Sequence, residues 1–274
     1  MKQIKILNIE QYVSMFNANN KEFNDIKWVE PVFIAMTSAY HDDISFNLET
    51  NNVYLYNMLT MNYKENTSYS PVEKVITRNG LEKISTHLTN IMIQNFGELS
   101  SIDTKDLRDY LQYLFLELMN NVADHAHSNG HVMTQYYKTN KKVQFAVADR
   151  GVGILSNIKL KYNNIHTEEA AIFKALEKGV TATVQKMYGQ EKNAGFGLYA
   201  MINILQQTDG RFVIISNDTL VRYVNGKYSV KKLVEPWKGV VVAFEFDEAK
   251  INFSMDDFKR NYLWNDLEDE EDFF

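Results

Sequence analysis

The chain has 274 residues, of which 45% are hydrophobic, 13% aromatic and 23% charged, a composition that excludes a disordered or fibrous protein and can bury one large core or two modest ones. It has no cysteine, which excludes disulfides, thiolate metal sites and cysteine nucleophiles and is typical of a reducing compartment. The N-terminus lacks an apolar leader, and no segment approaches the roughly 20 apolar residues that a membrane span requires. We therefore expect a cytoplasmic protein without a membrane partner.

The negative charge of the chain is concentrated near its C-terminus. The formal net charge is −6, with 29 basic and 35 acidic residues. Six acids fall in a terminal segment without a base: Asp266, Glu268, Asp269, Glu270, Glu271 and Asp272. The rest of the chain is neutral, so no basic excess indicates a nucleic-acid partner. We expect 251–274 to be an acidic tail, which is either solvated or a short docking peptide.

Residues 1–70 predict a small N-terminal α/β domain. Strands are expected at 4–7 and 44–48, and helices at 31–40 and near 52–63. The first of these helices begins with Pro31, a residue favoured at the first helical position. The polar run at 67–71 and the turn pair Asn79-Gly80 indicate a domain border between 66 and 81. Residues 71–100, with a helical pattern at 81–96, are expected to form a helical connector.

Residues 101–250 predict a larger α+β domain. A long helix is expected at 104–127, and its apolar stripe consists of Leu107, Leu111, Leu114, Leu118 and Val122. The apolar runs at 132–137 and 143–148 predict a β-hairpin. They are followed by predicted helices at 168–178 and 198–207 and strands at 212–216, 221–224, 228–233 and 240–246. Helices against a mostly antiparallel sheet form a two-layer α/β sandwich.

One edge of the long helix is polar. Glu117, Asn121, Asp124 and His125 lie at i, i+4, i+7 and i+8, beside the apolar stripe. A polar line at the border of a core is a place where a binding site can be built. It can equally be a solvated flank with His125 packed in the core.

Two glycine-containing segments accompany this helix. Asp149 ends an apolar strand, and in the following residues Gly151 and Gly153 allow the backbone to turn closely around a bound group. Gly195-Phe196-Gly197-Leu198 opens a helix after a polar loop, an arrangement that suits phosphate binding by backbone amides.

In order and residue type, these three segments resemble the GHKL ATPases, the class of gyrase, the MutL repair proteins, histidine kinases and anti-sigma-factor serine kinases. Residues 117–126 (E-L-M-N-N-V-A-D-H-A) resemble the N box in the form typical of the anti-sigma kinases. Residues 149–154 resemble the D-x-G-x-G-I box and 195–198 the G-x-G-L box. The resemblance covers 103–247 and implies a Bergerat fold, with 155–194 as an ATP lid that nucleotide orders.

The resemblance implies a site for ATP and Mg²⁺. Asn121 would hold the Mg²⁺, Asp149 would accept the exocyclic amine of adenine, and Glu117 would be the catalytic base. Gly151 and Gly153 would shape the adenine pocket, and Gly195 and Gly197 would let the lid approach the phosphates. The remaining cofactor-binding positions that the boxes imply are Asp124, His125, Ile154, Phe196 and Leu198, and either Lys192 or Lys186 could reach a phosphate.

The sequence departs from the family at a late strand. Many members have a threonine after the glycine of this strand, where it contacts phosphate. Here Gly239 is followed by Val240, so the pattern lacks that contact.

The form of the N box implies a regulatory ATPase or a serine/threonine kinase that acts on a protein partner, STAS-like or otherwise regulatory, and it allows a homodimer. Residues 28–36 faintly resemble a STAS domain that lacks the phosphorylated serine, so 1–70 is either a degenerate docking domain or an extension that completes the core. His87 is followed by Leu88-Thr89 rather than an acid and is interpreted as structural. The alternatives are a non-catalytic ATP-binding module and a divergent histidine-kinase-like protein.

Overall fold

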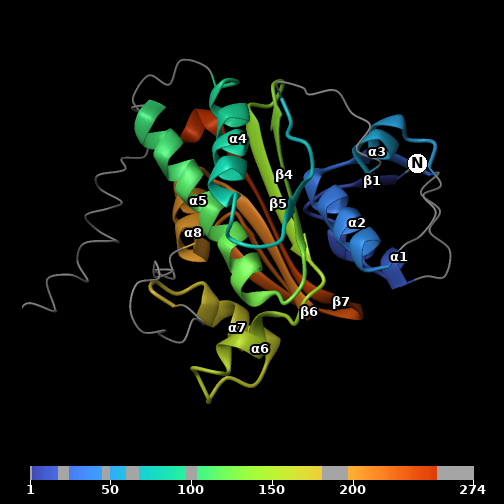
Figure 1. Ribbon diagram of the computed structural model, residues 1–274, viewed down its shortest axis with the longest axis vertical. Helices are drawn as coiled ribbons and strands as arrows, with labels where there is room; N and C mark the ends of the chain where they lie inside the picture. Colours follow the sequence, from blue (N-terminus) through green and yellow to red (C-terminus); the bar gives the residue numbers. More distant parts are fainter. Residues whose placement is uncertain are drawn as a thin grey trace, which may run out of the picture.

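The computed structural model describes residues 2–17, 25–44, 50–59, 68–96, 104–180 and 197–251, and it is a mixed α+β structure built on one five-stranded antiparallel sheet (Figure 1). The strand order is β3-β4-β5-β7-β6. The strands are β3 (Glu73–Val75), β4 (Gly130–Tyr137), β5 (Lys142–Asp149), β6 (Arg211–Val224) and β7 (Lys227–Asp247). The predicted hairpin is confirmed as β4 and β5, which pair from Gly130↔Asp149 to Tyr137↔Lys142.

Three helices cover one face of the sheet: α4 (Leu81–Ile93), α5 (Thr104–His125) and α8 (Gly197–Gln207). The predicted apolar stripe of α5 is buried in the core between these helices and the sheet. In that core, Phe145 stacks between Phe115 and Phe244, with ring centroids 4.7 and 5.2 Å apart. Such interlocked rings fix how α5 lies on β5 and β7.

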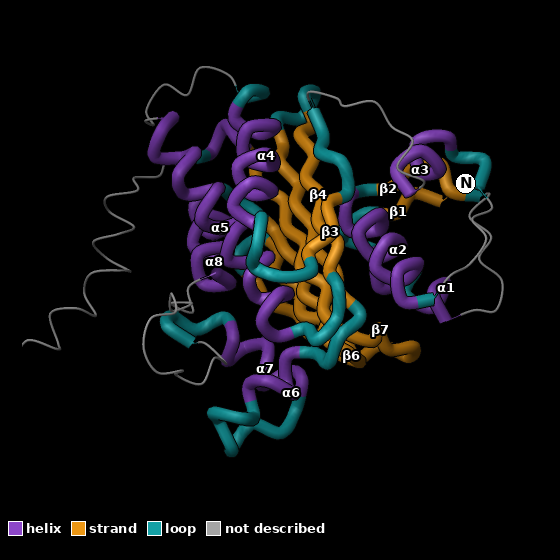
Figure 2. Tube along the Cα trace, in the orientation of Figure 1, coloured by secondary structure: helices purple, strands orange, loops and turns teal. Residues whose placement is uncertain are grey.

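The N-terminal segment covers the opposite face of the sheet (Figure 2). It contains β1 (Lys2–Ile4) and β2 (Ile26–Val29), which form a separate parallel pair, and α2 (Pro31–Asp43). Its shorter elements are a 3-10 turn (Ile9–Gln11), α1 (Ser14–Asn17) and α3 (Val53–Leu59). Helix α2 packs on β4 and β5, where the small side chains of Ala146 and Ala148 allow a close approach. Residues 68–251 thus form the expected two layers, helices against a sheet, and the N-terminal segment forms a third layer on the other face of the sheet.

A second hydrophobic core lies between the N-terminal segment and the sheet. We therefore predict that the sheet does not fold stably without the N-terminal segment. Residues 68–274 alone would expose the apolar sheet face that the N-terminal segment covers: Met133, Ala146, Ala148, Val213, Ile215 and Val241. Exposed apolar surface of this kind drives association. We expect this fragment to aggregate, whereas the whole chain unfolds cooperatively, as measured by size-exclusion chromatography and urea titration. A monomeric, cooperatively folded fragment would instead identify 1–70 as an independent domain.

Several elements differ from the sequence-based expectations. The strand expected at 4–7 ends at Ile4, because the backbone turns there and Asn8 and Glu30 accept hydrogen bonds from the amides of Lys5 and Ile6. Strand β3 and helix α6 (Ile154–Ile158) were not predicted, since both are too short to show a periodic pattern. Helix α7 (Glu168–Ala175) was predicted.

The four strands expected after residue 211 are the two long strands β6 and β7. The rings of Phe212 and Tyr223 stack 5.6 Å apart, although 11 residues of extended strand span about 36 Å. The chain therefore reverses direction within β6, at Asn217, where the register shifts and φ is 48°.

Some expectations fall outside the described residues. These are most of the strand at 44–48, the end of the helix near 63, the lid beyond Val180 with Lys186, Lys192, Gly195 and Phe196, and the tail after Ile251. Among the described helices, none has both the length and the apolar character that a membrane span requires.

Candidate functional site

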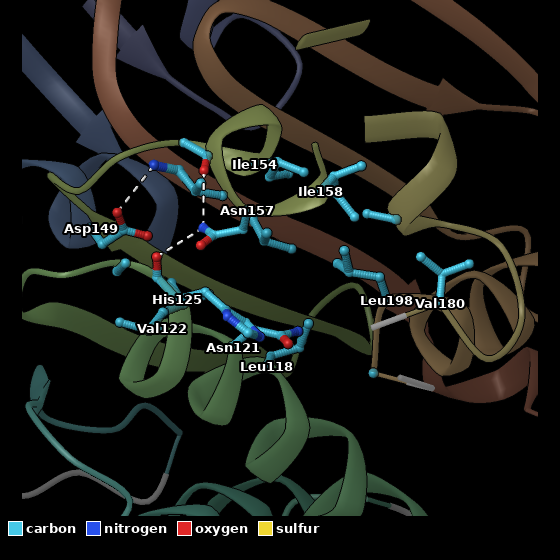
Figure 3. Close-up of a pocket in the computed structure, with 17 residues that line it drawn as sticks. Leu118, Asn121, Val122, His125, Asp149, Ile154, Asn157, Ile158, Val180 and Leu198 are labelled. Atoms are coloured by element: carbon cyan, nitrogen blue, oxygen red, sulfur yellow. Dashed lines mark hydrogen bonds between the residues drawn. The ribbon is translucent and has the colours of Figure 1, made fainter. Parts of the chain in front are cut away.

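A pocket of about 850 Å³, part of which is open to solvent, lies between α5, α6 and the start of α8 (Figure 3). We call it the central pocket. Its side walls are Leu118, Asn121, Val122 and His125 from α5 and Ile154, Asn157 and Ile158 from α6, with Asp149 at one end and Val180 and Leu198 at the other. The remaining lining residues are Ala126, Val147, Gly153, Ala175, Gly197, Val240 and Val242.

Helix α5 divides the four predicted polar residues between two directions. Asn121 and His125 line the central pocket. Asp124 turns away and accepts two hydrogen bonds from Arg78, at 2.8 and 2.6 Å. At about 100° per residue, Asp124 lies roughly 60° from Asn121 and roughly 100° from His125 around the helix axis, and Glu117 lies between Asp124 and Asn121. Asp124 therefore belongs to an ion pair beside the pocket and is absent from the lining.

Glu117 is not among the residues that line the pocket, but its Cβ lies beside Gly197, which does. A Cβ atom added to Gly197 would lie 2.8 Å from Cβ of Glu117 and 3.5 Å from Nδ2 of Asn121, so only glycine allows this approach. Burial raises the pKa of Glu117, while a hydrogen bond from Asn120 and the charge of Arg78 partly oppose this shift. The start of α8, whose first amides have no partner within the helix, thus faces Asn121 and Glu117 and can receive an anion.

Asp149 is 3% exposed and keeps one carboxylate oxygen for a ligand. Its Oδ1 accepts hydrogen bonds from the amides of Gly151 (2.8 Å) and Val240 (3.3 Å). Within the described residues, no donor bonds to Oδ2. Burial raises the pKa of Asp149 to about 7, although the two amide hydrogen bonds lower it. The carboxylate can therefore accept a further hydrogen bond from a ligand.

Glycines give the loop after Asp149 its shape. A Cβ atom at Gly151 would lie 1.9 Å from the carbonyl oxygen of Ala126, at the end of α5. Gly153 has a φ of +81°, and a Cβ there would lie 2.1 Å from Nδ2 of Asn217. Both predicted glycines are thus required for close packing, which lets the loop run between α5 and β6.

Gly239 of β7 supports the same loop from behind. Its φ is +107°, and an added Cβ would lie 2.4 Å from the carbonyl oxygen of Asp149 and 2.6 Å from the amide of Gly151. The resemblance drew attention to this strand because Val240, and not a threonine, follows Gly239, whereas the structural role of Gly239 is to let β7 approach the loop.

This contact predicts a large loss of stability for Gly239→Ala. We expect the free energy of unfolding to fall by about 2–5 kcal/mol, from strain at positive φ and from backbone clashes. Gly80→Ala is the matched control, because Gly80 also has positive φ (+87°) but nothing lies within 4 Å of an added Cβ. It should cost only about 1–2 kcal/mol in the same urea titration. Equal losses in the two variants would contradict the proposed close contact.

A polar network that sequence reasoning missed holds α6 and α7 in place. The carboxylate of Glu168, the first residue of α7, accepts hydrogen bonds of 2.6 Å from Ser216 and from Asn217, at the reversal of β6. Ser216 also accepts the amide hydrogen of Ile154 (2.8 Å), and Asn157 donates to the carbonyl of His125 (2.9 Å). The only sequence signal was the polar turn after an apolar strand at 212–216. The described part of the predicted lid is therefore anchored to the sheet and to α5.

The lining of the central pocket suits a largely apolar group that carries a hydrogen-bond donor. Leu118, Val122, Ile154 and Val240 offer apolar contact, and Asp149 offers the buried acceptor. The opposite end, with Asn121 and the start of α8, suits a polar or anionic group. Burial lowers the pKa of His125, which favours its neutral form.

The described residues contain no group of three or more histidine, aspartate or glutamate side chains that could hold a metal ion. A divalent cation at Asn121 would therefore take most of its ligands from the bound molecule and water, as Mg²⁺ commonly does with phosphates.

No model of a known protein family matches the chain, and no curated protein matches it in sequence.

Proposed function

We propose that this protein binds ATP with Mg²⁺ in the central pocket as a member of the GHKL class, with a Bergerat-type arrangement of residues 101–250. The observation that carries the proposal is the convergence of three segments distant in sequence. Residues of the N-box-like segment, the Asp149 loop and the start of α8 all line one cavity. Chance motif matches have no reason to meet in this way.

In this proposal, each end of the pocket receives one end of the nucleotide. Oδ2 of Asp149 accepts the exocyclic amine of adenine, and the apolar walls contact the faces of the ring. Asn121 supplies an oxygen ligand to Mg²⁺, which neutralises phosphate charge, and the first amides of α8 hold phosphate oxygens. In its ionised form, Glu117 would orient the attacking hydroxyl and remove its proton.

The biological role that fits these parts best is a serine/threonine kinase or ATPase switch of the anti-sigma type, which acts on a STAS-like or other regulatory protein. A non-catalytic ATP-binding module is the second candidate, because burial favours the neutral form of Glu117, which cannot accept a proton.

Calorimetric titration of the whole chain with ATP, with and without Mg²⁺, tests the binding proposal. We expect binding that depends on Mg²⁺ and prefers ATP over GTP, because guanine presents a carbonyl where adenine presents its amine. Equal affinity for GTP, or no binding, would contradict it. Phosphate release and phosphotransfer with candidate STAS partners then separate the kinase or ATPase from the binding module.

A further inference from the structure

Arg150 connects the Asp149 loop to the N-terminal layer. It directly follows Asp149 in the chain, is 8% exposed, and extends toward α2 on the opposite face of the sheet from α5. Its guanidinium carbon lies 4.7 Å from the ring centre of Tyr40 and 5.0 Å from that of Trp237. Its Nε donates a hydrogen bond of 3.1 Å to Asp43 at the end of α2. We call Tyr40, Asp43, Arg150 and Trp237 the arginine clamp.

The clamp also holds the backbone of Asp149. The indole nitrogen of Trp237, a fully buried residue, donates a hydrogen bond of 2.9 Å to the carbonyl oxygen of Asp149. Two positions later, Gly239 packs against the same carbonyl, and the amide of Val240 bonds to the carboxylate. The stretch of β7 that stacks on Arg150 thus fixes both the main chain and the side chain of Asp149.

The aromatic contacts continue into the N-terminal layer. Phe16 of α1 lies edge-on to Trp237, with ring centroids 5.2 Å apart, and 5.5 Å from Tyr40. A buried guanidinium is costly unless rings and an acid compensate it, so its position is set by where α2 places Tyr40 and Asp43. Any shift of α2 would therefore move Arg150, which is adjacent in the chain to Asp149 and its carboxylate.

We propose that the arginine clamp is a positioning device through which helix α2 holds Asp149 in its amine-accepting orientation, so that the N-terminal layer sets selectivity for the adenine base. This inference rests on the proposed function. Arg150 and Trp237 are positioning residues, since neither lines the central pocket. By linkage, ATP binding must tighten the packing of α2 to the same degree that the clamp tightens ATP binding.

The test compares two nucleotides that differ only in the group that Asp149 accepts. ATP carries the exocyclic amine, and purine riboside 5′-triphosphate lacks it. Isothermal titration of the whole chain with each nucleotide gives a selectivity ratio. A residue that merely stabilises the fold would weaken both nucleotides equally and leave this ratio unchanged.

We expect Arg150→Gln to lower the ATP-to-analogue ratio by about tenfold, the equivalent of one hydrogen bond to a charged group. Asp43→Asn should lower it by about threefold, as for a partly exposed ion pair. Asp43 has a side chain that is 35% exposed, so this variant should fold even where Arg150→Gln does not. The matched controls are Arg222→Gln and Glu10→Gln, which break another ion pair between the N-terminal segment and the sheet, away from Asp149.

Each outcome decides the inference. A reduced ratio in the clamp variants with a native ratio in the controls supports it, as does increased protection of α2 amides from hydrogen exchange when ATP binds. A native ratio in Arg150→Gln and Asp43→Asn, while the native chain still prefers ATP, overturns the clamp and leaves the proposed function standing. No preference for ATP in the native chain overturns both.

Discussion

Glu117→Gln is expected to bind Mg·ATP as tightly as the native protein and to lose about 10²- to 10⁴-fold in turnover, the usual contribution of a general base. Glutamine keeps the shape of the side chain and its packing against Gly197, but it cannot accept a proton. Asn121→Ala should behave differently in kind. It would remove the proposed oxygen ligand of Mg²⁺, so the dependence of binding on Mg²⁺ should be lost together with turnover.

Calorimetry and a phosphate-release or phosphotransfer assay, with the partner present, measure both quantities. Asp124→Asn is the control for loss of a negative charge from α5, because Asp124 pairs with Arg78 outside the pocket. It should reduce turnover by no more than a few fold. If Glu117→Gln turns over at the native rate, Glu117 is not the base, and the non-catalytic module becomes the better explanation.

The affinity for ATP is expected to rise with pH between about 6 and 8, because Asp149 must be ionised to accept the amine of adenine. Burial raises the pKa of this carboxyl to about 7, so a large share is protonated at pH 6. A protonated Oδ2 would be a hydrogen-bond donor and could not accept a hydrogen bond from the amine of adenine. Purine riboside 5′-triphosphate, which lacks the amine, controls for titration of the phosphates and should show no rise attributable to Asp149.

The same shift has the opposite effect on the stability of the unliganded protein. Because the pKa of Asp149 is higher in the folded state than its ordinary value of 3.8, the folded state loses stability as pH rises from about 4 to 7. The loss from this one group is on the order of a few kcal/mol.

Asp149→Asn tests both effects at once. The asparagine Oδ1 can keep the hydrogen bonds from the amides of Gly151 and Val240, but its Nδ2 would face the amine of adenine. We expect at least a 100-fold loss of ATP affinity, about 3 kcal/mol or more, together with a higher Tm than the native protein at pH 8. Native affinity in this variant would refute the adenine assignment, and an unchanged Tm would refute the buried-charge argument.

The elements that were predicted well are those with strong local patterns. The stripe of α5, Pro31 at the start of α2 and the hairpin of β4 and β5 all follow from side-chain periodicity or turn chemistry within one segment. Short elements such as β3 and α6 lack such a pattern. The reversal inside β6 was also missed, because its turn at Asn217 is stabilised by Glu168, which lies 49 residues away in the sequence.

For the candidate site, the sequence by itself determined which residue types are present: an asparagine on a helix, an aspartate at a strand end, and glycines where the backbone must turn. These are local requirements, so a motif can carry them. Only the tertiary structure decided which side chains meet. In the folded chain, Asp124 pairs with Arg78, Gly239 packs against the carbonyl of Asp149, and Arg150 bonds to Asp43 of α2. The sequence could not show these contacts, because burial and hydrogen-bond partners depend on segments that are distant along the chain.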